Sequence, residues 1–117
     1  ALSFAAVNGH EGLAEALLQR GVDVSLQSSN GGTALMLAAR NGHEKLVELA
    51  LRHGAAIDQQ SDTGDTALIR AALYGHLAAL LCMLRGGADV TLRTAAGKTA
   101  LQWAKEQGHT ECVRALE

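Results

Sequence analysis

The sequence predicts an all-α solenoid in which pairs of short helices, joined by turn hairpins, stack on one another. The first observation is a step of 33 residues. Two motifs return at this step, Gly-His at 9–10, 42–43, 75–76 and 108–109, and Thr-Ala-Leu at 33–35, 66–68 and 99–101. The second observation is that each period contains two stretches with apolar residues at helical spacing, followed by a polar stretch. A unit of this length buries its apolar face by stacking on neighbouring units.

The second period shows how each element follows from its residues. Residues 34–40 place three apolar side chains on one helical face, namely Leu35, Ala38 and Ala39. Gly42 ends this helix, and residues 43–53 again carry apolar side chains at helical spacing. The following stretch, 55–66, is rich in Asp, Gln, Ser, Thr and Gly and predicts an extended turn.

The period divides one domain into four units. Their expected bounds are 1–27 for a partial repeat, 28–60, 61–93, and 94–117 for a C-terminal cap. Ala1 falls just inside a repeat whose turn and threonine are missing, so we expect a cut or unusually short N-terminal edge. In the last unit Lys105 replaces a small alanine and the final helix is more polar, as suits a terminal repeat.

These motifs resemble the ankyrin repeat along the whole chain. The residues that carry the resemblance are Gly-Gly-Thr-Ala-Leu-Met-Leu-Ala-Ala (31–39), Asn-Gly-His (41–43), Gly-Ala-Ala-Ile-Asp (54–58) and their later copies. The family's Thr-Pro-Leu-His pattern is altered, with alanine in the proline position and Met36, Ile69 or Gln102 in the histidine position. The resemblance implies about three and a half repeats with the usual fold, because alanine favours helix. We expect the polar network of the family's histidine to be lost.

Composition and charge exclude several classes of protein. Ten basic and twelve acidic residues give a net charge of −2, which argues against nucleic-acid binding through phosphate neutralisation. Three aromatic residues provide no platform for stacking bases in series. No apolar run is long enough to span a membrane. Two cysteines in 117 residues do not form a disulfide framework, which favours the cytoplasm, or the nucleus, as the compartment.

The residue pattern predicts no catalytic, cofactor-binding or metal-binding residue. Four histidines occupy the same position in successive units, namely His10, His43, His76 and His109. Stacked helices lie about 8–10 Å apart, too far for these rings to share one ion. We expect the histidines to hold the start of the second helix by hydrogen bonds to the backbone. Cys82 and Cys112 fall at apolar helix positions and are expected to be buried thiols.

Three aspartates cluster on one predicted turn, at positions 58, 62 and 65. Their spacing does not fit a calcium-binding loop, so we expect solvated carboxylates.

The resemblance implies that the turn tips and the exposed side of each first helix form a concave face that binds proteins. The helix candidates are Phe4, Val7, Asn8, Leu37, Arg40, Asn41, Arg70, Leu73, Tyr74, Trp103, Glu106 and Gln107. The tip candidates are Gln27, Ser29, Asn30, Gly32, Gln60, Asp62, Thr63, Asp65, Arg93, Ala95, Ala96 and Lys98.

Within this surface we predict a smaller set of partner-binding residues, which consists of Arg40, Asn41, Asp62, Asp65, Arg70, Leu73, Tyr74, Lys98, Trp103 and Glu106. Arg70, Tyr74 and Trp103 are expected at the centre, with a contact between the arginine and the indole. Asp62, Asp65 and Lys98 are expected to form a charged rim. The sequence therefore predicts a monomeric, non-catalytic module for binding a partner protein, with no nucleic-acid or membrane partner. The alternatives are a structural or designed scaffold without a natural partner, and a regulatory segment of a larger multidomain protein.

Overall fold

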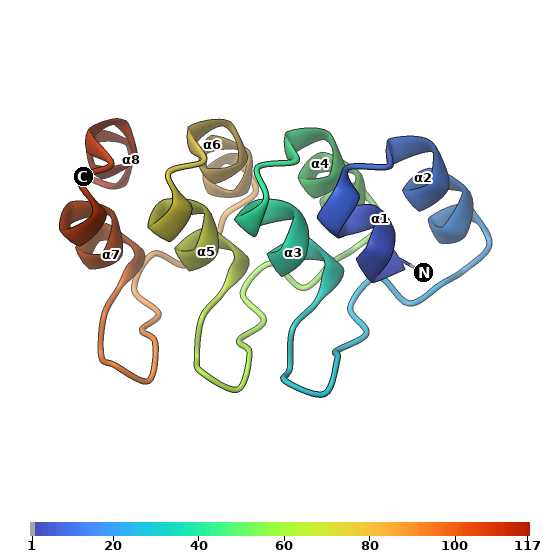
Figure 1. Ribbon diagram of the computed structural model, residues 1–117, viewed down its shortest axis with the longest axis horizontal. Coiled ribbons are helices and arrows are strands. Elements are labelled where there is room, and N and C mark those ends of the chain that lie inside the picture. The colour runs from blue at the N-terminus through green and yellow to red at the C-terminus, as the bar shows by residue number, and fades with distance from the viewer. Residues whose placement is uncertain (1) are drawn as a thin grey trace.

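The helices stack in two rows, as the repeat pattern predicts. The computed structural model describes residues 2–117, and the position predicted for Ala1 lies outside the described residues. Within this range the helices are α1 (Leu2–Asn8), α2 (Glu11–Gln19), α3 (Ala34–Arg40), α4 (Glu44–Arg52), α5 (Ala67–Tyr74), α6 (Leu77–Arg85), α7 (Ala100–Gln107) and α8 (Thr110–Leu116). Figure 1 shows α1, α3, α5 and α7 in one row and the even-numbered helices in a second row. The loops between repeats project beside the odd-numbered row.

A threonine begins each odd-numbered helix after α1. Its hydroxyl oxygen accepts a hydrogen bond from a main-chain N–H that would otherwise lack a partner. The three bonds are Met36 to Thr33 (3.3 Å), Ile69 to Thr66 (3.2 Å) and Gln102 to Thr99 (3.3 Å). The side chain of Gln102 also accepts from the N–H of Thr99 at 2.8 Å, which completes a capping box. Met36 and Ile69 are buried and apolar, whereas Gln102 keeps a polar role that was not predicted.

A glycine in each of the first three repeats lies against the histidine ring of the next repeat. The rings of His43, His76 and His109 lie against Gly9, Gly42 and Gly75, respectively. A Cβ atom at Gly42 or Gly75 would lie 2.6 Å from Nδ1 of the histidine, which is too close for any side chain. Both glycines also have positive φ angles, of 74° and 73°, which side chains rarely adopt. Glycine is therefore required here for two independent reasons.

The rings of His43 and His109 bond to the preceding repeat and not to their own helix. The main-chain carbonyl of His43 accepts from the N–H of Val47 at 3.1 Å, so the expected backbone bond at the helix start is present. The ring makes no capping bond and instead donates from Nε2 to the carbonyl of Val7 at 2.9 Å. His109 makes the equivalent bond to Leu73 at 3.0 Å. The sequence did not predict that the ring would bond to the preceding repeat.

Small side chains let the repeats approach closely. One alanine position is almost fully buried in every repeat, at Ala5, Ala38, Ala71 and Ala104. The next position is buried at Ala6, Ala39 and Ala72, whereas Lys105 is exposed at the end of the stack. The lysine therefore lies where no further repeat covers the helix.

The hairpins are joined to one another by main-chain hydrogen bonds. The N–H of Asp62 donates to the carbonyl of Asn30 at 3.0 Å. The N–H of Ala95 donates to the carbonyl of Thr63 at 2.8 Å. Because these bonds fix each tip against the next, the three hairpins form one continuous edge beside the odd-numbered helices (Figure 1).

Candidate partner-binding surface

The hairpins and the exposed side of the odd-numbered helices form one surface, which we call the hairpin face. It carries the predicted helix residues Arg40 and Asn41 on or after α3, Arg70, Leu73 and Tyr74 on α5, and Trp103 and Glu106 on α7. It also carries Asp62 and Asp65 in the second hairpin and Lys98 in the third. Trp103, Leu73 and Arg70 are half-buried, whereas Tyr74, Arg40 and Glu106 are exposed.

Tyr74 lies on this face beside an arginine of the preceding repeat. The side chain is 45% exposed, so a large part of the ring is available for contact. The guanidinium carbon of Arg40 lies 5.3 Å from the ring centroid, within the range of a cation–π contact. The two side chains therefore hold each other in place on the surface.

Trp103 is held in a similar way by a lysine of its own repeat. The Nζ atom of Lys98 lies 4.7 Å from the indole ring. The same ammonium pairs with the carboxylate of Glu106 at 2.7 Å. Because both charged groups are partly exposed, the ion pair adds little stability, but it fixes the position of the ammonium above the ring.

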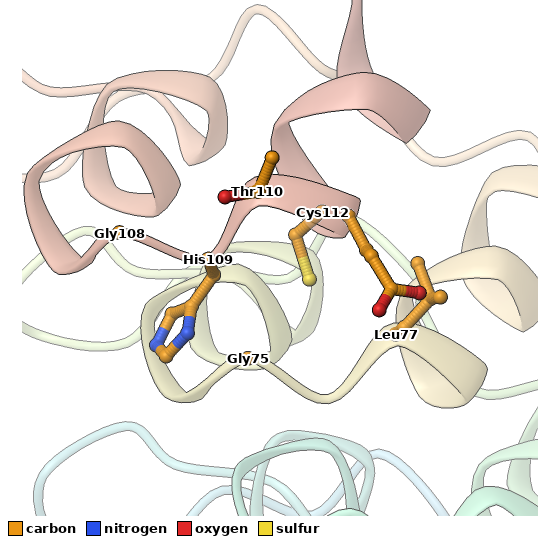
Figure 2. A pocket seen from close by; sticks show the side chains of 7 residues that line it. Gly75, Leu77, Gly108, His109, Thr110 and Cys112 are labelled. Atoms are coloured by element: carbon orange, nitrogen blue, oxygen red, sulfur yellow. The ribbon is translucent and has the colours of Figure 1, made fainter.

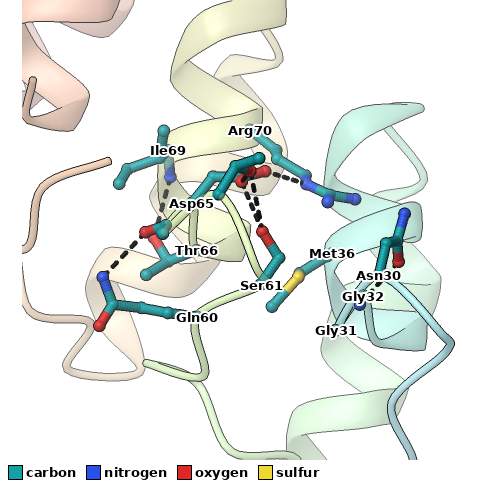
Figure 3. Close-up of polar contacts among 12 residues, drawn as sticks. Asn30, Gly31, Gly32, Met36, Gln60, Ser61, Asp65, Thr66, Ile69 and Arg70 are labelled. Carbon is teal, nitrogen blue, oxygen red and sulfur yellow. Dashed lines mark hydrogen bonds and ion pairs between the residues drawn. The ribbon is translucent and has the colours of Figure 1, made fainter. Parts of the chain in front are cut away.

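Asp65 and Arg70 form the most enclosed ion pair of the hairpin face (Figure 3). The Nε atom of Arg70 donates to Oδ2 of Asp65 at 2.5 Å. The hydroxyl of Ser61 donates to the same carboxylate at 2.6 Å, and Thr63 also donates to it. Burial alone would raise the pKa of Asp65, but these hydrogen bonds and the charge of Arg70 lower it to about 2.

Two expectations about these residues are wrong. Asp65 is not a solvated rim carboxylate, because it is half-buried and accepts three side-chain hydrogen bonds. Arg70 is not held by Trp103, since its guanidinium pairs with the carboxylate five residues earlier. The sequence did contain an indication of this ion pair, because position 65 carries an acid where the equivalent positions of two other repeats carry Gly32 and Lys98.

A groove opens on the hairpin face between the third and fourth repeats. Its volume is about 350 Å³, and its lining consists of Thr63, Asp65, Ile69, Leu73, Thr94, Ala95, Ala96 and Trp103. The sequence pointed to most of these residues separately, but Ile69 and Thr94 were missed. Ile69 was assigned to the family's histidine position, which does not indicate a groove, and the sequence indicated no role for Thr94.

A second cavity of about 330 Å³ lies at the loops between paired helices (Figure 2). Its lining includes Cys112, Glu111 and His109. Burial raises the pKa of the Cys112 thiol, and the nearby Glu111 carboxylate raises it further. The ring of His109 is bonded to the carbonyl of Leu73 and lies against Gly75. The arrangement therefore favours an unreactive thiol over an activated nucleophile.

Cys82 resembles Cys112 in this respect, because burial raises the pKa of its thiol too. Both cysteines are free and buried. Within residues 2–117, no group of three or more His, Cys, Asp and Glu side chains is arranged to hold a metal ion.

The stacked helix pairs and their hairpins define a helical repeat protein. A family model for ankyrin repeats, in three copies, matches residues 2–94 and thus most of the chain. The chain therefore belongs to the ankyrin repeat family, whose members are generally protein–protein interaction modules and typically non-catalytic. No curated protein matches the sequence. None of the helices in the described part of the chain is long and apolar enough to cross a membrane.

Proposed function

We propose that the chain binds a partner protein through its hairpin face and performs no catalysis. The observation that carries this proposal is the placement of Tyr74, whose ring is 45% exposed and lies against Arg40 of the preceding repeat. Tyrosine and arginine are enriched among residues that contribute most to binding energy at protein interfaces. The hairpin face corresponds to the concave face that the ankyrin resemblance implies.

The scaffold supports binding because its contact residues are already fixed. Main-chain bonds join neighbouring hairpins, and cation–π contacts hold Tyr74 and Trp103. A surface that is ordered before binding loses less conformational entropy when the partner docks. Lys98, Glu106 and Asp62 surround these contacts and would act mainly on association rate and salt dependence.

The test compares two single variants in binding to a partner captured with the parent chain. Tyr74→Ala should weaken binding by about 1–3 kcal/mol, or about 5- to 150-fold in affinity. The matched control is Arg52→Ala on α4, an exposed arginine in the other row of helices. Circular dichroism should show the same helical content for both variants and the parent chain.

If Tyr74→Ala binds as tightly as the parent chain, the hairpin face is not the binding surface. A loss confined to Arg52→Ala would move the interface to the outer helices, around Glu48 and Arg52. If no specific partner can be captured, a structural or designed scaffold becomes the better interpretation.

We also propose that the chain is a monomer of the cytoplasm or nucleus. The buried free thiols of Cys82 and Cys112 support a reducing compartment. The exposed Lys105 places a charge on α7 where the other repeats bury alanine, which disfavours packing of a second copy against this position. Sedimentation equilibrium should give the mass of one chain, 12.2 kDa, across a wide range of concentrations.

A further inference from the structure

On the hairpin face, two successive junctions between repeats carry different side chains at equivalent positions. At the junction of the second and third repeats, the large side chain on α5 is that of Arg70, which pairs with Asp65. A Cβ atom at Gly32 would lie 4.0 Å from its guanidinium, so the side chain extends toward the preceding hairpin. At the next junction the equivalent residue is Trp103, and the groove of about 350 Å³ lies beside it.

Small and apolar residues leave this second junction open. Ala95 and Ala96 stand in the last hairpin where the preceding hairpin has Asp62 and Thr63. Leu73 stands on α5 where α3 has Arg40. The one carboxylate in the lining, Asp65, already pairs with Arg70. The groove therefore offers apolar walls without an unpaired charge.

Two polar atoms of the groove residues have no hydrogen-bond partner within residues 2–117. They are Nε1 of Trp103 and Oγ1 of Thr94, both closed off from solvent. A buried donor without an acceptor costs about 1–3 kcal/mol, and an indole N–H can only donate. The contact with Lys98 holds the ring but leaves Nε1 without an acceptor, so a segment that carries an acceptor into the groove gains a hydrogen bond when the indole turns toward it.

We propose that the groove between Leu73 and Trp103 binds an extended segment of a partner protein that inserts one aliphatic side chain. A main-chain carbonyl of the segment accepts from Nε1 of Trp103, and a neighbouring polar group pairs with Thr94. The inference rests on the proposed protein-binding function.

The size of the groove and its lack of an unpaired charge favour an aliphatic side chain carried by an extended segment. Its volume is at the lower end for ligand pockets, which suits a side chain with its flanking backbone. A helix is about 10–12 Å across with its side chains, so a single turn of it would exceed the volume of the groove. A charged side chain would meet apolar walls and would lose its hydration without gaining a partner.

The experiment uses random peptides displayed on phage and selected on the whole chain. Selected peptides are synthesised and titrated while the emission of Trp103, the only tryptophan, is recorded. We expect the peptides to share an aliphatic residue and to shift the emission. Replacing this residue by aspartate in the peptide should weaken binding about 10- to 100-fold.

Matched variants of the chain locate the site. Ala96→Arg adds bulk and charge at the groove wall, and Ala78→Arg adds the same group on the exposed surface of α6, in the other row of helices. We expect Ala96→Arg to weaken peptide binding about tenfold or more and Ala78→Arg to leave it unchanged. Trp103→Phe keeps an aromatic ring without the N–H and should weaken binding by a smaller factor.

The outcomes separate this inference from the proposed function. Peptides that are sensitive to Tyr74→Ala but not to Ala96→Arg overturn the groove and leave the hairpin face as the interface. Peptides that are insensitive to both variants bind elsewhere and overturn the groove, whereas the hairpin face as a whole is overturned only if Tyr74→Ala leaves binding of the captured partner unchanged. If no displayed peptide binds, the groove does not select extended segments, although a folded partner can still use the face. The substitution in the peptide keeps the test valid if Ala96→Arg fails to fold.

Discussion

Leu13 and Leu46 occupy the same position in successive repeats, but their surroundings differ. Leu13 is 42% exposed, whereas Leu46 is 4% exposed. In the third and fourth repeats the same position holds Ala79 and Cys112, each 1% exposed. The helices that carry these residues are similar, so the difference comes from the preceding repeat, which covers Leu46 and not Leu13. Burial in this fold is supplied by the neighbour and not by the repeat itself.

The histidines show the same contrast between the first repeat and the later ones. His43 reaches back to the carbonyl of Val7 and lies against Gly9. His10 instead stacks on Phe4 of its own repeat, with the ring centroids 5.6 Å apart. Phe4 itself remains 59% exposed. The first repeat therefore packs against a neighbouring repeat on one side, whereas the inner repeats pack on both sides.

The largest effect on folding should come from a deletion that disrupts the 33-residue period. Deleting residues 34–66, one whole period, keeps the remaining repeats in register, because Thr33 then stands where Thr66 stood before α5, and should leave a folded helical protein. Deleting residues 44–59, about half a period, removes α4 and should abolish folding, because α2 and α6 lose their neighbour. Circular dichroism and thermal unfolding provide the measurement. Equal folding of the two deletions would show that stability does not depend on matched neighbours.

A smaller effect is expected from the two leucines that define the contrast. Leu46→Ala should lower the free energy of unfolding by about 2–4 kcal/mol, because it empties a buried site. Leu13→Ala should lower it by about 1 kcal/mol or less, since much of the side chain is already in water. Urea denaturation of both variants gives the values. Similar losses would mean that the first repeat is covered in solution, for example by self-association at high protein concentration.

Hydrogen exchange should resolve the same difference without any substitution. Residues 2–18 stack against a repeat on one side only, whereas residues 68–84 stack on both sides. We expect amide exchange about tenfold faster or more in the first segment, because local opening there breaks fewer contacts. The measurement belongs at low protein concentration. Equal protection in the two segments would contradict the one-sided packing of the first repeat.

The smallest effect concerns one ion pair of the second hairpin. Since the pKa of Asp65 is lowered from 3.8 to about 2, its ionised form stabilises the fold at pH values above 3.8. This contribution decreases as the pH falls toward 2. Asp65→Asn should therefore cost about 1 kcal/mol at neutral pH, allowing for partial solvation, and much less near pH 2. Asp62→Asn at the exposed tip is the control. A loss that is independent of pH would assign the role of Asp65 to shape and not to charge.

Most of the fold could be predicted because it depends on spacing. The 33-residue step, the threonine that begins each odd-numbered helix and the glycine that ends it set the order and type of the elements. The predicted helix 34–40 agrees with α3, and the predicted 43–53 exceeds α4 by one residue at each end. These features are local, so they can be read from one repeat at a time.

The contacts between repeats were harder to predict. Alignment of the repeats shows that Arg70 and Trp103 occupy equivalent positions. It does not show which neighbouring side chain each of them contacts. Arg70 turns to Asp65, because a carboxylate attracts a guanidinium more strongly than an indole does. The groove depends on two alanines opposite a tryptophan, a combination of sizes that no single motif records.

The histidine–glycine contact also bears on how such a chain changes length during evolution. The carbonyl of Val7 and the turn at Gly9 lie on the side of the first repeat that faces the second. His43 lies on the side of the second repeat that faces the first. The third and fourth repeats meet in the same way through Leu73, Gly75 and His109. Each inner repeat thus presents a glycine turn to the next repeat and a histidine ring to the preceding one. A gene segment that encodes one period can be duplicated or lost, and the repeats brought together will still fit.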